Sequence, residues 1–168
     1  MNVRPAGIGV DGDTATGMTK VATRSGVFER IAREAAASIG CRLFTVTAFD
    51  APAMQVQRIY SSNPSTYPVG GRKSKGDTEF ARQVLVAGQT LVCEGDPAIR
   101  RVFDDHATIF SLDLHSSINA PVLAEKRCAG VLNFLMSAQR VTPEQLGAAC
   151  AFAREPIVIA VLLQTNGV

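Results

Sequence analysis

The order of the predicted elements indicates an α+β fold, in which one mainly antiparallel sheet is flanked by helices. In some stretches apolar residues recur every three or four positions, as in an amphipathic helix, and in others they alternate with polar ones, as in a strand. These stretches follow as helix, two strands, helix, strand, helix, two strands and helix. With 168 residues, 46% of them hydrophobic and 19% charged, the chain can form one domain with a sizeable core.

The first predicted elements are a helix and a hairpin. Ser25 is a suitable N-cap, and apolar residues then recur at helical spacing until Gly40, where a helix is expected to end. Residues 41–50 and 55–61 have the alternation of strands and are separated by a short break containing Pro52. The two strands are therefore expected to pair.

The middle of the chain predicts two more helices and a short strand between them. Asp77 or Thr78 can cap a helix that ends near Gly88, and residues 90–94 follow as a strand. The Asp96-Pro97 pair then opens another helix, with the proline at the first position, where it is tolerated.

The last part of the chain predicts a second hairpin and a final helix. Residues 116–123 and 128–136 are apolar strands joined by a polar turn. Thr142 begins a capping box, and the helix that it starts is expected to run towards Leu163. Pro156 removes one backbone donor and should kink or restart this helix.

The ends of the chain contain no predicted targeting signal. Residues 1–24 are rich in Gly and Thr without sustained periodicity, and we interpret them as a flexible N-terminal arm before a domain over residues 25–168. Glycine and aspartate residues interrupt any apolar run of signal-peptide length in this arm. The most apolar stretch, residues 157–163, is far shorter than the ~20 residues needed to cross a bilayer. We therefore expect a cytoplasmic protein without a membrane partner.

The charge and aromatic content exclude the usual features of nucleic-acid binding. The formal net charge is +2, and the chain has two Tyr, eight Phe and no Trp. Such a chain has neither a strong basic field nor many stacking platforms, so no nucleic-acid partner is expected. The four cysteines, Cys41, Cys93, Cys128 and Cys150, match no zinc spacing and are interpreted as reduced core residues.

Two neighbouring motifs resemble those of a GAF domain. Residues 117–123, Ser-Ile-Asn-Ala-Pro-Val-Leu, form an apolar-Pro-apolar strand, and residues 130–135, Gly-Val-Leu-Asn-Phe-Leu, follow after a tight turn. The preceding elements occur in the order of that family, so the resemblance covers residues 25–163. It implies an antiparallel sheet of five to six strands, helices on one face, a small-molecule pocket under loops on the other, and a homodimer formed through the terminal helices.

The best-defined activities of this family are not supported by the residues present. Free methionine-(R)-sulfoxide reductases resemble the chain in the pocket strand, but Phe110-Ser111 stand where those enzymes have an essential Cys-Asp pair. Ser117 likewise stands at the position of their glutamate. The signature of cyclic-nucleotide-binding members is absent, and no cysteine can be assigned to bilin attachment. These departures leave a small-molecule sensor without an assigned ligand.

The loop over residues 62–76 contains the most distinctive polar segment. Three cations follow Gly70-Gly71 and precede a predicted helix, an arrangement that could hold a carboxylate or phosphate. We predict ligand contacts from Tyr67, Arg72 and Lys73, and we favour Arg72 because its planar guanidinium suits a carboxylate. The alternative is a solvated basic turn.

A second set of predicted ligand contacts comes from the strand before Pro121 and the helix before it. Strand alternation places His115, Ser117 and Asn119 on one face, where they could meet a small polar ligand. Phe103 could form a pocket wall or belong to the core. The alternative for the strand residues is a face exposed to solvent.

Other conspicuous residues have simpler explanations. His106, beside two aspartates, is expected at a helix end and not as a metal ligand, and the sequence suggests no catalytic residue, metal or cofactor. The final helix is apolar on more than one side around residues 157–162, which favours self-association over burial within one chain.

These observations predict a sensor domain that binds a small, anionic metabolite and signals through a partner or a change in a dimer. The ligand would lie between the Pro121 strand, the Phe103 helix and the loop over residues 67–76. One alternative is a thiol-dependent redox enzyme using Cys93 or Cys128 with a nearby histidine. Another is a dimerisation module whose pocket is filled by side chains.

Overall fold

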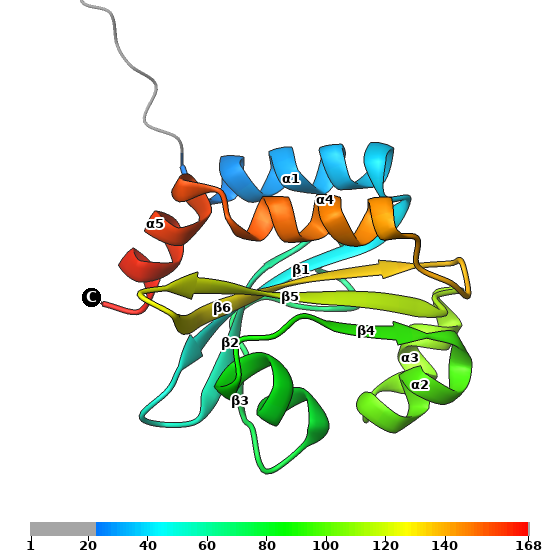
Figure 1. Ribbon diagram of the computed structural model, residues 1–168, viewed down its shortest axis with the longest axis horizontal. Coiled ribbons are helices and arrows are strands. Elements are labelled where there is room, and N and C mark those ends of the chain that lie inside the picture. The colour runs from blue at the N-terminus through cyan, green and yellow to red at the C-terminus, as the bar shows by residue number, and fades with distance from the viewer. Residues whose placement is uncertain (1–22, 168) are drawn as a thin grey trace, which may run out of the picture.

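A single antiparallel sheet of six strands, in the order β3-β2-β1-β6-β5-β4, forms the centre of the protein (Figure 1). The computed structural model describes residues 23–167, so the predicted arm over residues 1–24 lies almost wholly outside the described residues. The strands are β1 (Cys41–Asp50), β2 (Gln55–Ser61), β3 (Arg72–Ser74), β4 (Leu91–Glu94), β5 (Ser116–Ala124) and β6 (Arg127–Met136).

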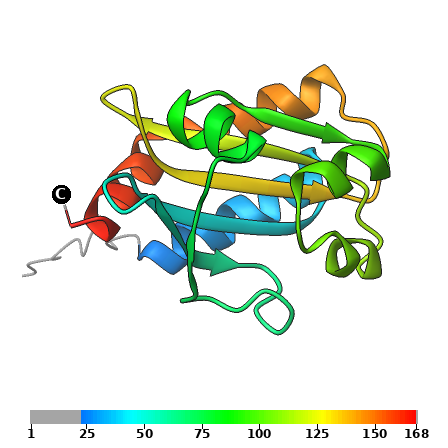
Figure 2. The ribbon, with the colours of Figure 1, turned by 90° about the horizontal axis from the view of Figure 1, so that it is seen from below.

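Helices cover both faces of the sheet (Figure 1). The upper face in that view carries α1 (Arg24–Ser38), α4 (Pro143–Ala153) and α5 (Pro156–Thr165). The lower face carries three short helices, which Figure 2 shows from below: η1 (Ala81–Val86), α2 (Gly95–Val102) and α3 (His106–Ser111). The α+β fold with an antiparallel sheet is therefore confirmed, although the face expected under loops alone also carries these helices.

The sheet divides the interior into two apolar cores. One lies under α1, α4 and α5 and contains Phe28, Phe44 and Phe134, all almost fully buried. The other lies against η1, α2 and α3 and includes Leu43, Val131 and other strand residues of the opposite face. Because successive strand residues point to opposite faces, the alternation seen in the sequence supplies both cores.

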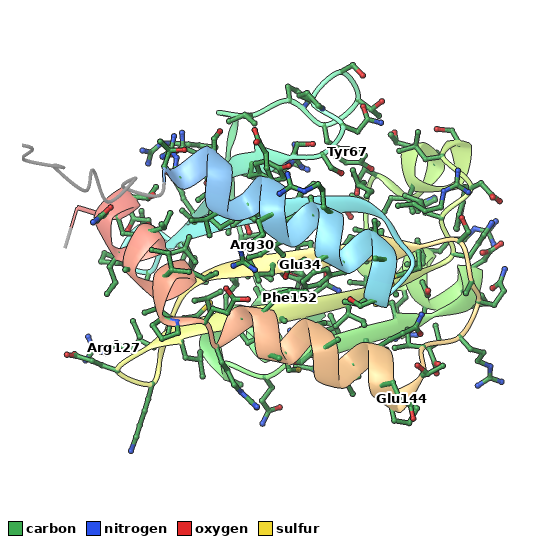
Figure 3. All side chains as sticks on the ribbon, turned by 90° about the horizontal axis from the view of Figure 1, so that it is seen from above. Arg30, Glu34, Tyr67, Arg127, Glu144 and Phe152 are labelled. Atoms are coloured by element: carbon green, nitrogen blue, oxygen red, sulfur yellow. The ribbon has the colours of Figure 1, made fainter. Side chains whose placement is uncertain are left out.

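The final helix is interrupted at the predicted proline. Thr142 and Gln145 form the capping box that starts α4, and Pro156 stands in the first turn of α5. The two helices are bent by 54° at the break, where Glu155 pairs with Arg30 of α1. Figure 3 shows Arg30 on α1. No single helix of the described residues is long and apolar enough to cross a membrane. Only α4 and α5 taken together have the necessary length and composition, and they are bent at the break.

Several predicted boundaries need correction. Helix α1 begins at Arg24, because the Thr23 side chain, and not that of Ser25, accepts a hydrogen bond from the Gly26 amide. The predicted loop after β2 contains β3, a short edge strand of exposed polar residues that has no apolar alternation to reveal it. The helix after Pro97 does not continue, because Phe103 has an extended backbone with φ −114° and ψ 120°.

Candidate functional site

A pocket of about 300 Å³ lies on the lower face of the sheet, and we call it the Tyr67 pocket. Its floor consists of strand side chains, among them Thr45, Thr47 and Asn133. One wall is the chain between β2 and η1, and the other is the segment that joins α2 to α3. Residues distant in sequence therefore meet around one cavity.

The floor of the pocket continues a polar row across the sheet. Asn133 of β6 pairs directly with Thr45 of β1 and with Asn119 of β5, so these three side chains share one face. The Asn133 amide donates to the hydroxyl of Thr45 over 3.3 Å. The Asn119 amide donates to Ser117 Oγ over 2.9 Å and to the Leu91 carbonyl over 3.2 Å.

Arg58, which is half-buried, and Tyr67, which is buried, form a polar part of the walls. The Arg58 guanidinium carbon lies 5.0 Å from the centre of the Tyr67 ring, and Arg58 Nη1 donates to the Pro68 carbonyl over 3.1 Å. Tyr67, on the loop between β2 and β3, is only 8% exposed (Figure 3). Its hydroxyl and Arg58 Nε are both buried and have no hydrogen-bond partner among the described residues. Two donors are thus left unused beside a cavity.

Burial also perturbs the titration of two groups in this pocket. It raises the pKa of Tyr67, and the nearby Asp105 carboxylate adds to the shift. The phenol therefore remains a neutral donor at physiological pH. Burial lowers the pKa of Lys75, with a further contribution from Lys73, and the Lys75 ammonium lies 5.2 Å from the centre of the Phe80 ring. Both shifts indicate a poorly solvated site.

Charges of opposite sign face each other across the pocket. Arg58, Lys73 and Lys75 come from β2, β3 and the chain that follows β3, whereas Asp104 and Asp105 come from the segment that joins α2 to α3. Within the described part of the chain, none of these five side chains forms an ion pair within 4.0 Å. The three cations against two carboxylates leave a net positive charge around the cavity.

The structure divides the residues predicted as ligand contacts into separate groups. Tyr67, Lys73 and Phe103 line the Tyr67 pocket. Arg72 instead lines a second cavity of about 490 Å³ near the β1–β2 and β5–β6 turns. The reason is strand geometry, because Arg72 and Lys73 are consecutive residues of β3 and point to opposite faces.

Ser117 and Asn119 are fully buried on the sheet face that floors the pocket, but they line none of the described cavities. Both lie on the part of β5 that pairs with β4, beside the apolar core that includes Val84 and Leu85 of η1. The Asn119 side-chain oxygen has no hydrogen-bond partner among the described residues. The alternative of a solvent-exposed strand face is therefore wrong for these two residues.

His115 lies just before β5 and belongs to a cluster of charged groups. Its Nδ1 is 2.6 Å from Asp96 of α2, and its Nε2 is 3.1 Å from Asp113. The ring stacks on Phe110 with centroids 6.0 Å apart. Hydrogen bonding to Asp96, and then to Asp113, raises the pKa of His115. These contacts explain His115 as a link between α2 and β5.

Arg58, Asp104 and Asp105 were not predicted as ligand contacts, and Lys75 was included only as one of the three cations that follow Gly70-Gly71. Asp104 and Asp105 were considered only as neighbours of His106, whose Nδ1 lies 2.9 Å from the Phe103 carbonyl. Arg58 is one polar residue in an alternating strand, and nothing local distinguishes it. The signal available was the density of charge in residues 72–75 and 104–105, but their proximity depends on the tertiary fold.

The three buried thiols lie in surroundings that disfavour the thiolate. Burial raises the pKa of Cys41 to about 12 and that of Cys128 to about 11, and it raises the pKa of Cys93 as well. In residues 23–167 no histidine is hydrogen-bonded to a cysteine, and no three metal-ligating side chains come together. A buried thiol with a raised pKa is a poor nucleophile, which disfavours the redox alternative.

Comparison with known proteins agrees with the architecture of a six-stranded antiparallel sheet with helices. The GAF domain family matches residues 23–155, and the chain therefore belongs to the GAF family, whose members are known for binding small molecules or chromophores and for signalling. No curated protein matches the chain.

Solved structures similar to this chain include other GAF domains. That of a two-component sensor histidine kinase from Bacillus halodurans is 11% identical, with a TM-score of 0.69, over 86% of this chain and 97% of that one. That of a phosphoenolpyruvate-protein phosphotransferase from Coxiella burnetii is 12% identical, with a TM-score of 0.64, over 82% of each chain. The chromophore-binding domain of a bacteriophytochrome from R. palustris is 14% identical, with a TM-score of 0.61, over 88% of this chain and 57% of that one. Likeness at this level establishes the fold.

Proposed function

We propose that this GAF domain is a sensor that binds a small anionic metabolite in the Tyr67 pocket. The observation that carries the proposal is the pair of buried donors, the Tyr67 hydroxyl and Arg58 Nε, that lack partners beside the cavity. A buried polar group without a hydrogen bond costs about 1–3 kcal/mol. A carboxylate or phosphate oxygen that accepted from both groups would offset this cost with charge-assisted hydrogen bonds.

The size and lining of the pocket support a small ligand. Ligand cavities typically range over about 300–1,000 Å³, and this one, at about 300 Å³, lies at the lower end. Phe80 and Phe103, whose ring centres are 6.4 Å apart, provide an aromatic surface beside the polar groups. No cysteine lines the cavity, so a covalently attached chromophore has no anchor there.

We further propose that the output passes through a homodimer formed by the terminal helices. In α5, Val158, Val161 and Leu162 are buried within the chain, whereas Ile157 remains 39% exposed. Burial within the chain therefore accounts for much of the apolar surface from which the sequence analysis expected self-association, and Ile157 is the large apolar residue of α5 that an interface would cover. Analytical ultracentrifugation should find a dimer that Ile157→Glu dissociates, and a monomeric wild type would contradict this part of the proposal.

Native mass spectrometry of gently purified protein tests the binding proposal most directly. We expect a retained small molecule whose mass identifies an anion, lost in Arg58→Gln and in Tyr67→Phe. Tyr60→Phe is the matched control, because Tyr60 packs between Phe28 and Phe44 in the core of the other face. If the protein carries no small molecule, and if a panel of small carboxylates and phosphates leaves its melting temperature unchanged, the proposal is wrong.

A further inference from the structure

We infer that the ligand of the Tyr67 pocket is a small zwitterion, such as an α-amino acid, with its anionic group at Arg58, Tyr67 and Lys75 and its ammonium group at Asp104 and Asp105. This inference rests on the proposed function and adds the second half of the ligand. An anion alone would use only one wall of the cavity. The opposite wall presents two carboxylates, which would repel an anion unless a positive group lay between them and it.

The arrangement of charge in the rest of the protein makes this pocket distinctive. Elsewhere the structure brings opposite charges together, as in Arg30 with Glu155, Arg82 with Asp77 at 2.6 Å, and Arg101 with Glu79 at 3.0 Å. In the Tyr67 pocket, cations and carboxylates line the same cavity and yet remain more than 4.0 Å from one another. A ligand with both charges would bridge the gap.

The surroundings of these charges favour a bound group over water. Tyr67 is more than nine-tenths buried, and Arg58 Nε beside its ring is buried without a hydrogen-bond partner among the described residues. The Lys75 ammonium is partly desolvated and rests against the Phe80 ring. Arg58, Lys75 and Asp105 are half-buried, whereas Asp104 lies at the exposed rim. Charges with reduced access to solvent interact more strongly with a ligand than exposed ones do.

The neutral part of the lining indicates how the rest of the ligand is held. Thr45, Thr47 and Asn133 supply a polar floor, whereas Phe80 and Phe103 supply an apolar wall. A side chain of modest size would contact the aromatic wall, while the charged end of the zwitterion spans the two charged walls. The volume of about 300 Å³ suits a ligand of modest size.

Matched sets of probes test this inference. The twenty common L-amino acids are first screened by thermal shift, and each that stabilises the protein is compared by calorimetry with its des-amino acid and with its decarboxylated amine. For L-phenylalanine these partners are 3-phenylpropanoate and phenethylamine. We expect the amino acid to bind at least about tenfold more tightly than either partner, because each partner leaves one charged wall unmatched.

Substitutions of Asp104 and Asp105 test whether these two carboxylates bind the ammonium group of the ligand. The double variant Asp104→Asn, Asp105→Asn should weaken amino acid binding at least about tenfold and should leave or improve binding of the des-amino acid. Asp77→Asn is the control, since Asp77 is an exposed carboxylate paired with Arg82 outside the cavity. Circular dichroism with urea unfolding verifies that each variant is folded.

The outcomes separate this inference from the proposed function. If a des-amino acid binds wild type as tightly as its amino acid, the zwitterion is wrong and the anion sensor stands. If the double aspartate variant instead weakens binding of all probes equally, the aspartates do not hold the ammonium group, which also overturns the inference. If no amino acid binds but other small anions do, only the inference fails, and if neither class binds, both proposals fail.

Discussion

At the scale of the residue, Gly130 determines how closely the sheet and α5 approach each other. It begins the Gly-Val-Leu stretch that resembled a GAF motif in the sequence, and its place in the structure gives the physical reason for a glycine there. A Cβ at this position would lie 2.4 Å from the Thr47 carbonyl oxygen and 2.8 Å from Leu162. Leucine could shift, but the backbone of the neighbouring strand has no room to do so.

We therefore expect Gly130→Ala to lower the free energy of unfolding by at least about 2 kcal/mol, measured by urea denaturation. Gly147→Ala is the matched control. Gly147 is exposed within α4, and nothing lies within 4 Å of the added Cβ, so alanine should stabilise the protein by about 0.5–1 kcal/mol. A neutral Gly130→Ala would contradict the close packing of β1 and α5 at this residue.

Tyr67 gives a second prediction at this scale, because its hydroxyl is buried without a partner. In the ligand-free protein, Tyr67→Phe removes an unsatisfied polar group and retains the ring. We expect the free energy of unfolding to rise by about 1 kcal/mol, again from urea denaturation, while ligand binding weakens. Tyr60→Phe should change stability by less than about 0.5 kcal/mol. A destabilised Tyr67→Phe would show that the hydroxyl is already satisfied.

At the scale of the element, His115 connects α2 with the start of β5. Its ring lies between Asp96 and Asp113, and Arg42 lies 3.5 Å from Asp113 on the same side. The two carboxylates raise the pKa of His115 above its ordinary value of about 6.5. The protonated form is therefore preferred in the folded protein relative to the unfolded chain.

The sign of the pH dependence follows from this raised pKa. The stabilisation by His115 is fully present below about pH 6.5 and is lost as the pH rises through the higher folded pKa. Urea denaturation of wild type and His115→Gln should show a larger stability difference near pH 5.5 than near pH 8.5. Solvent screening keeps this difference below about 1 kcal/mol. A difference that grows with pH would contradict the assigned contacts.

The bounds of several helices and strands could be predicted from the sequence, and those of others could not. Strands β1 and β2 have the predicted bounds, and the Thr142 capping box starts α4 as expected, because alternation and capping are local. The edge strand β3 and the end of α2 at Phe103 were missed. Pairing with β2 stabilises β3, and the three exposed residues carry no pattern of their own.

The candidate site was only partly predictable for a related reason. Tyr67, Lys73 and Phe103 were identified, but the face to which a residue points depends on the register with its neighbours, and this separates Arg72 from Lys73. Arg58 and Asp105 are 47 residues apart in the sequence, and only the tertiary fold brings them to one cavity.

At the scale of the whole molecule, the four thiols report on the integrity of the two cores. Cys41 packs in the core under α1, whereas Cys93 and Cys128 pack in the core of the other face. Cys150 on α4 is half-buried, with its sulfur 3.5 Å from the Thr90 hydroxyl. A thiol reagent can reach the three buried sulfurs only when the protein opens.

Titration of the native protein with a thiol reagent should therefore modify at most one cysteine promptly, and Cys150→Ser should abolish that reaction. In denaturant all four should react. The slow native reaction of the other three should accelerate with urea as the protein unfolds, since burial keeps these thiols protonated as well as covered. Prompt reaction of Cys93 or Cys128 in the native state would contradict the assigned burial and restore the redox enzyme as a competing function.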